Sequence, residues 1–175
     1  MTVATILTLS RIFLVPIFLV VVLTTEEIPY RQTLAALVFT LAAATDGLDG
    51  YIARARREVT KFGTLMDPIA DKILISSALI ALVELDLISA WIAVIIIGRE
   101  FAVSGLRLIA AKENVIIPAS IGGKIKTFSQ IVAIITLLLH LPGSIYLIWL
   151  SAFITIYSGI DYFLKAQKLF KRREE

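Results

Sequence analysis

Four aspartates lie within a short segment of a chain that is otherwise 58% hydrophobic: Asp46, Asp49, Asp67 and Asp71. A carboxylate at membrane depth costs roughly 2.5–3.5 kcal/mol on insertion scales, so four of them need a compensating partner. Carboxylate oxygens are hard ligands, which select Mg²⁺, Ca²⁺ or Mn²⁺ rather than zinc. The cluster therefore predicts a divalent-metal site at a membrane boundary.

The spacing of the four aspartates fits two antiparallel helices. Asp46 and Asp49 stand at i, i+3, and Asp67 and Asp71 at i, i+4, so each pair shares one helical face. If the chain turns near Glu58–Val59, the two pairs come level and can converge on one or two ions. The alternative is a solvated turn, in which the carboxylates pair with the nearby bases Arg54, Arg56, Arg57 and Lys61.

The elements that must position these residues are long apolar helices. A mean hydropathy of +0.90 is far above that of a soluble domain. The absence of cysteine excludes disulfides, thiolate zinc sites and a cysteine nucleophile. We expect residues 1–175 to form one domain of an all-α, polytopic membrane protein. Six transmembrane helices are predicted near residues 8–24, 31–55, 62–84, 88–111, 124–141 and 144–165.

The basic residues predict the orientation in the membrane. They gather around the second turn, around the connection between the fourth and fifth helices, and at the C-terminus, whereas the opposite side carries mainly Glu26, Glu27, Glu84 and Asp86. By the positive-inside rule, the metal site and both termini face the cytoplasm. The net charge of +3 is thus a topology signal and does not indicate nucleic-acid binding.

The aspartates belong to a longer pattern with fixed gaps. It reads Asp46-x2-Asp49-Gly50-x2-Ala53-Arg54-x8-Gly63-x3-Asp67-x3-Asp71. This pattern resembles the signature of the CDP-alcohol phosphatidyltransferase family. Two further segments, Gly98–Arg107 and Gly123–Thr127, resemble the bacterial members that use glycerol 3-phosphate as acceptor. The resemblance runs over nearly the whole chain and implies an enzyme of phospholipid biosynthesis in the bacterial inner membrane.

The resemblance implies a reaction and roles for the aspartates. An alcohol attacks the β-phosphorus of CDP-diacylglycerol, and CMP leaves. Asp46, Asp49 and Asp67 would hold two Mg²⁺ or Mn²⁺ ions. Asp71 would be the general base that accepts the proton of the acceptor hydroxyl, and a further metal ligand. The family resemblance also implies a homodimer.

Small residues and one arginine match the family positions that line the nucleotide pocket: Gly50, Ala53, Arg54 and Gly63. Arg54 can bind a phosphate or pair with an aspartate, and its alternative role is that of an arginine snorkelling to the interface. Near the N-terminus, Thr8 is a further candidate for the CDP-lipid, or a simple interfacial anchor.

A basic cluster is the candidate site for the acceptor phosphate. Arg107, Lys124 and Lys126 are its expected members, with Arg99 beside them. The alternative is positive-inside charge without a ligand, and Glu100 could pair with Arg107. Other acceptors, such as serine or inositol phosphate, stay open. Two other classes also compete: an intramembrane prenyltransferase, whose aspartate motifs lie farther apart on a longer chain, and a small cation carrier.

Overall fold

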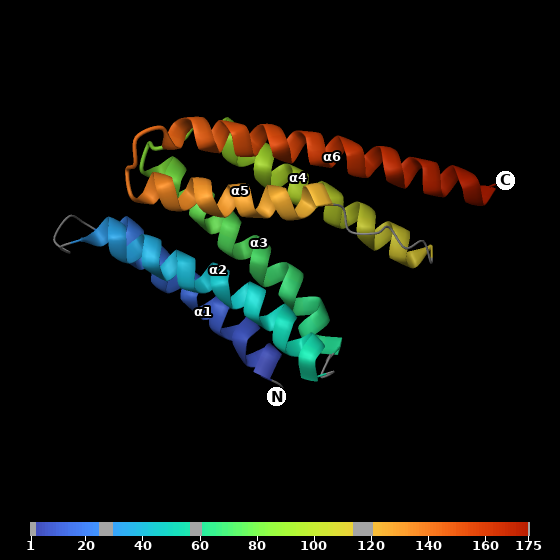
Figure 1. Ribbon diagram of the computed structural model, residues 1–175, viewed down its shortest axis with the longest axis horizontal. Helices are drawn as coiled ribbons and strands as arrows, with labels where there is room; N and C mark the ends of the chain where they lie inside the picture. Colours follow the sequence, from blue (N-terminus) through green and yellow to red (C-terminus); the bar gives the residue numbers. More distant parts are fainter. Residues whose placement is uncertain (1–2, 25–29, 57–60, 114–120, 175) are drawn as a thin grey trace.

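The structure, a computed structural model, describes the backbone of residues 3–24, 30–56, 61–113 and 121–174, and the side chains of residues 8–24, 30–45, 69–113 and 122–167. Within these residues the regular elements are all α-helices (Figure 1): α1 (Val3–Leu23), α2 (Arg31–Arg56), α3 (Lys61–Glu84), α4 (Ala90–Lys112), α5 (Ile121–Leu138) and α6 (Ser144–Glu174). The prediction of six helices in an all-α chain is confirmed. The largest difference is α6, which continues to Glu174 instead of ending near residue 165.

The short turns between helices have local chemical causes. Ser89 caps the N-terminus of α4, and its hydroxyl accepts a hydrogen bond from the backbone N–H of Trp91 over 3.3 Å. Asp86, between α3 and α4, has a φ of 56°, and aspartate tolerates this left-handed region better than most residues. Gly143 ends the α5–α6 turn with a φ of 82°, a conformation that glycine adopts without strain.

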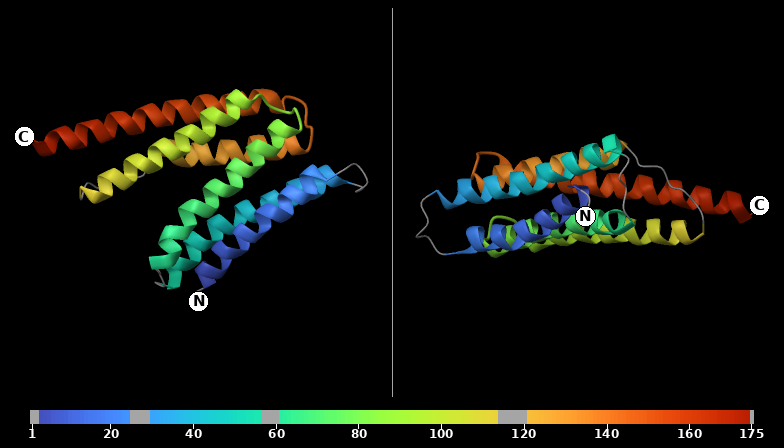
Figure 2. Two further views of the ribbon diagram at one scale, coloured as in Figure 1. Left: turned by 180° about the vertical axis from the view of Figure 1, so that it is seen from behind. Right: turned by 90° about the horizontal axis from the view of Figure 1, so that it is seen from below.

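The helices meet at one end of the molecule and fan out toward the other. The end of α1 and the beginning of α2 lie on the same side as the α3–α4 and α5–α6 turns (Figure 1). From there, α1 to α3 diverge from α4 to α6. Both views in Figure 2 show the chain termini away from the α3–α4 and α5–α6 turns. The N-terminus, the end of α2 and the beginning of α3 therefore share the open side of the bundle.

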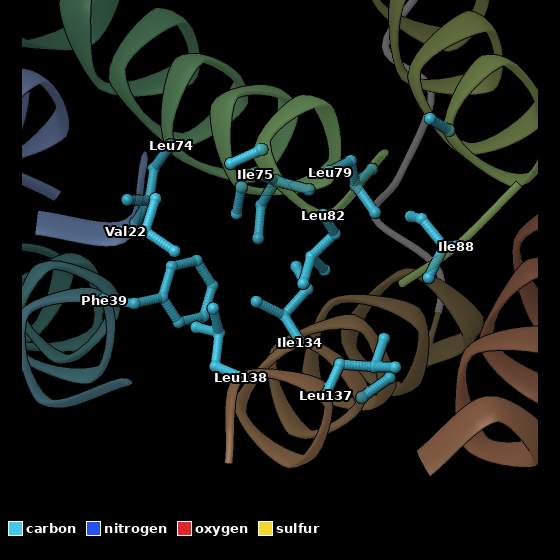
Figure 3. Packing of buried hydrophobic residues seen from close by; sticks show 14 of the residues in the cluster. Val22, Phe39, Leu74, Ile75, Leu79, Leu82, Ile88, Ile134, Leu137 and Leu138 are labelled. Atoms are coloured by element: carbon cyan, nitrogen blue, oxygen red, sulfur yellow. The ribbon is translucent and has the colours of Figure 1, made fainter. Parts of the chain in front are cut away.

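The apolar core fills the closed side of the bundle. It draws on the last parts of α1, α3 and α5 and on the first parts of α2, α4 and α6. Figure 3 shows the packing of its buried side chains. The rings of Phe18 and Phe39 pack with their centroids 5.8 Å apart and tilted by 51°. Around them lie Leu74, Leu82 and Leu138, all of them buried. The closed side thus carries most of the hydrophobic packing.

Many large apolar side chains lie on the outer surface instead. Leu108 is 75% exposed and Phe153 is 68% exposed. Among the described residues, Ser144–Gln167 is the one segment long and apolar enough to cross a membrane, and Thr8–Leu23 is a shorter apolar helix. Exposed large apolar side chains in this number, on helices of this length, fit contact with lipid or with another protein.

Candidate active site

The aspartate motif is divided between two helices that pack against each other. Asp46 and Asp49 fall on α2, whereas Asp67 and Asp71 fall on α3. Several of the predicted site residues have side chains outside the described part of the chain: Asp46, Asp49, Asp67, Gly50, Ala53, Arg54 and Gly63. Among the described side chains, no group of three His, Cys, Asp or Glu residues could hold a metal ion. Because three of its four ligands are not described, the metal site stays a prediction.

Several polar residues of the described part of the chain are buried inside the bundle. They come from α1, α5 and α6, and as whole residues none is more than 6% exposed: Thr8, Arg11, Lys126, Gln130, Ser151, Thr155 and Ser158. Buried polar groups need partners, since an unpaired one costs about 1–3 kcal/mol. The contacts of these residues therefore show how the helices pair polar groups inside the bundle.

Lys126 connects the basic cluster to the aspartate motif. It lies near the beginning of α5, where it is 6% exposed. Asp71 on α3 is half-buried, and its electrostatic interaction with Lys126 is weaker than that of Glu100. The α3 and α5 helices contact each other, so a predicted acceptor-binding residue and the predicted general base lie on neighbouring helices.

Glu100 on α4 joins Lys126 to Arg99. Its Oε1 accepts a hydrogen bond from Lys126 Nζ and one of 3.4 Å from Arg99 Nη1. The three side chains are nearly buried, with exposures of 13% for Glu100, 7% for Lys126 and 12% for Arg99. Removing one member of such a buried ion pair typically costs about 3–5 kcal/mol, because the other charge is left uncompensated. The three charges therefore form an ion-pair cluster inside the bundle, and they are not surface charges.

Arg107 is held by α6, not by Glu100. Its Nε donates a hydrogen bond of 3.0 Å to the Tyr162 hydroxyl, and its Cζ lies 5.1 Å from the centroid of the Tyr162 ring. The pairing of Glu100 with Arg107, left open from the sequence, is replaced by pairing with Lys126 and Arg99. The Ser104 hydroxyl, on the same helical face, donates to the backbone oxygen of Glu100.

The two lysines of the predicted cluster lie in different surroundings. Lys124 is exposed, whereas Lys126 is buried. Residues two apart on a helix point to different sides, so a single ligand contacts both lysines less readily than it contacts Lys126 and Arg99. The structure thus favours Lys126 over Lys124 as a member of the interior site.

The first helix contributes a buried residue that was not among the predicted site residues. Arg11 is fully buried, and its Nε donates a hydrogen bond of 3.4 Å to the Thr45 hydroxyl, one residue before Asp46. Thr8, predicted for the CDP-lipid, is 1% exposed on the same helix. The sequence signal that could have identified it is an arginine three residues after Thr8 in an otherwise apolar helix, since such a charge needs partners when it is buried.

The closed end of the bundle holds a small separate cavity of about 120 Å³, lined in part by Arg31 and His140. His140 lies in the turn after α5, at the end of the bundle away from the aspartate motif. No predicted site residue lines this cavity.

Comparison with known proteins gives one consistent result. The model of the family described as CDP-alcohol phosphatidyltransferase matches residues 1–157. A protein of Bacillus subtilis named CDP-diacylglycerol–glycerol-3-phosphate 3-phosphatidyltransferase is 43% identical over 91% of this chain and 92% of its own length. A protein of the same name from Rickettsia felis is 40% identical over 94% of each chain. A probable phosphatidylglycerophosphate synthase of Mycobacterium tuberculosis is 40% identical over 93% of this chain and 80% of its own length.

Proposed function

The chain belongs to the CDP-alcohol phosphatidyltransferase family, and on that premise we propose that it transfers a phosphatidyl group from CDP-diacylglycerol to sn-glycerol 3-phosphate. The products are phosphatidylglycerophosphate and CMP. The relatives named for this reaction cover nearly the whole chain, which supports the same acceptor here. The family acts in membranes, and the exposed apolar surface of the helices fits that setting.

The observation that carries the acceptor assignment is the buried cluster in which Lys126 and Arg99 share the carboxylate of Glu100. Asp71 lies on α3, which packs against the helix of Lys126. Glycerol 3-phosphate brings a phosphate dianion, which needs cations, and a hydroxyl, which needs a base. A site with lysine and arginine next to a carboxylate supplies both. An unphosphorylated acceptor such as serine would give these buried cations no phosphate to bind.

In the proposed reaction, the acceptor hydroxyl oxygen forms a bond to the β-phosphorus of the CDP-lipid. The bond from that phosphorus to the bridging oxygen breaks, and CMP leaves with the electron pair. Asp71 takes the hydroxyl proton. Lys126 and Arg99 bind the acceptor phosphate, together with Arg107, while Lys124 contributes from the exposed side. They orient the hydroxyl toward the β-phosphorus.

The donor set of the motif fits a divalent metal. Asp46, Asp49, Asp67 and Asp71 offer only carboxylate oxygens on two packed helices, the ligand type of Mg²⁺ and Mn²⁺. We propose two such ions, which when bound would neutralise the pyrophosphate of the CDP-lipid. Beside them, Thr8 and a set of α2 and α3 residues would line the CDP-lipid pocket: Gly50, Ala53, Arg54 and Gly63.

We further propose that the six helices cross the bacterial inner membrane as a single domain and form a homodimer. With an even number of spans, both termini and the motif lie on one side, and the positive-inside rule assigns that side to the cytoplasm. CDP-diacylglycerol would then enter from the bilayer, and glycerol 3-phosphate from the cytoplasm.

One assay tests the proposed function. The purified protein in detergent is given CDP-diacylglycerol and Mg²⁺ or Mn²⁺, with glycerol 3-phosphate, glycerol, serine or inositol phosphate as acceptor, and CMP release is measured. We expect release that depends on the metal and on glycerol 3-phosphate. Equal release with serine or with glycerol would overturn the acceptor assignment, and no release with any acceptor would overturn the enzyme assignment.

A further inference from the structure

A row of buried polar side chains runs along α6, the helix best suited to cross a membrane. Ser151, Thr155, Ser158 and Tyr162 follow one another at spacings of four, three and four residues, so they share one helical face. None is more than 2% exposed. Polar groups inside a membrane-spanning helix face the protein interior and mark positions with a specific task.

The partners of this row change along the helix. Ser151 lies 3.4 Å from the Ser129 hydroxyl, and Thr155 accepts a hydrogen bond of 3.1 Å from the Gln130 amide, so both meet neutral side chains of α5. The later residues meet charged side chains of α4. Ser158 accepts a hydrogen bond of 2.8 Å from Arg99 Nη2.

Tyr162 continues this row with Arg107 as its partner. The hydroxyl accepts from Arg107 Nε at 3.0 Å, and the guanidinium carbon lies 5.1 Å from the ring centroid. A hydrogen bond and a cation–π contact to the same residue fix the plane of the guanidinium. A guanidinium carries five N–H donors, and the bond to Tyr162 uses one of them. The others keep their capacity to bind an anion.

Gly159 makes room for Arg99 between Ser158 and Tyr162. A Cβ atom at this position would lie 3.0 Å from Arg99 Cγ and 3.4 Å from Arg99 Nε. The arginine stem therefore lies directly against the α6 backbone. Only glycine permits this approach without moving the side chain by a few tenths of an ångström.

We propose that Ser158, Gly159 and Tyr162 are positioning residues that hold Arg99 and Arg107 ready for the phosphate of the acceptor. This inference rests on the proposed function and assigns to α6 a role in acceptor affinity. An arginine side chain loses rotamer entropy when it is fixed. Holding it in place before the acceptor binds removes part of that cost and raises affinity without a direct contact to the acceptor.

The test compares matched substitutions on one face of α6. Ser158→Ala and Tyr162→Phe each remove one hydroxyl that holds an arginine, whereas Ser151→Ala removes a hydroxyl that meets only Ser129. We expect the first two to raise KM for glycerol 3-phosphate about three- to tenfold, with kcat and KM for CDP-diacylglycerol nearly unchanged. Ser151→Ala should leave all three constants at the wild-type values.

Two further measurements separate positioning from a general loss of structure. Tyr162→Phe should have no added effect on KM when Arg107 is already alanine, because its role depends on that arginine. Gly159→Ala should raise KM for glycerol 3-phosphate through Arg99, with the hydroxyls intact. Wild-type KM values in both Tyr162→Phe and Gly159→Ala would overturn the proposal, as would equal changes in KM for the two substrates. If the wild-type protein releases no CMP with glycerol 3-phosphate, it is the proposed function that fails.

Discussion

Replacing Lys126 tests the candidate acceptor site most directly. We expect Lys126→Ala to raise KM for glycerol 3-phosphate strongly and to leave KM for CDP-diacylglycerol nearly unchanged. A hydrogen bond to a charged group contributes about 1.5–3 kcal/mol, and about 1.4 kcal/mol corresponds to a tenfold change. The expected increase is therefore about ten- to hundredfold. The upper part of that range applies because the Lys126 side chain is only 7% exposed, so solvent screens it little.

Lys124 provides the matched control, since it is an exposed lysine on the same helix. Exposed charge pairs contribute roughly 0–1 kcal/mol, so Lys124→Ala should change KM for glycerol 3-phosphate less than about fivefold. If both lysines gave the same change, the distinction between the buried and the exposed position would be wrong.

Loss of folding must be separated from loss of binding, because Lys126→Ala leaves Glu100 with Arg99 as its remaining partner in the ion-pair cluster. Breaking a buried pair typically costs about 3–5 kcal/mol when the other charge is left uncompensated. Lys126→Met keeps the length of the side chain and leaves the pair of Glu100 with Arg99 in place, so this variant should be about as thermally stable in detergent as the wild type. It should still show the raised KM for glycerol 3-phosphate. A stable Lys126→Met variant with a wild-type KM would refute the role of Lys126 in acceptor binding.

Three other substitutions probe the motif and its surroundings. Asp49→Ala should abolish CMP release while the protein still inserts and purifies, and near-wild-type activity would contradict the metal-site prediction. Asp71→Asn should lower turnover by roughly 10²–10⁴-fold, because the amide cannot accept the proton, and CDP-lipid binding should be kept. If CDP-lipid binding is lost as well, the main role of Asp71 is that of a metal ligand. Asp161→Asn should leave the kinetic constants within about twofold, since its ion pair with Lys165 is exposed, and a large change would show a role that the structure does not indicate.

The sequence predicted the helices well because each one is a long apolar run with a polar break. The helix expected near residues 62–84 ends where α3 ends, at Glu84, and the helix expected near 124–141 ends three residues beyond the last residue of α5, Leu138. The end of α6 was placed too early, because the prediction counted apolar residues that fit a bilayer. Lysine, arginine and glutamate are good helix formers, so the charged tail continues the helix to Glu174.

The site was predictable in its residue types but not in its pairings. The basic residues were identified, yet the sequence left Glu100 with Arg107 as a possible partner, and the structure gives it Lys126 across 26 residues of chain. The contacts of Arg99 with Ser158 and of Arg107 with Tyr162 span 59 and 55 residues. Such pairings depend on which helices pack together, and helical periodicity within one segment does not contain that information.

The division of the bundle into an apolar closed side and a polar open side explains how it tolerates so many buried charges. A buried ion pair is often no more stable than an apolar replacement, so Lys126, Glu100 and Arg99 contribute little to net stability. Core residues such as Phe18, Phe39 and Leu82 pack on the closed side of the bundle, in an apolar cluster. Substitutions on the open side should therefore change substrate constants more than stability when they remove charges in pairs, and substitutions in the apolar core should do the reverse.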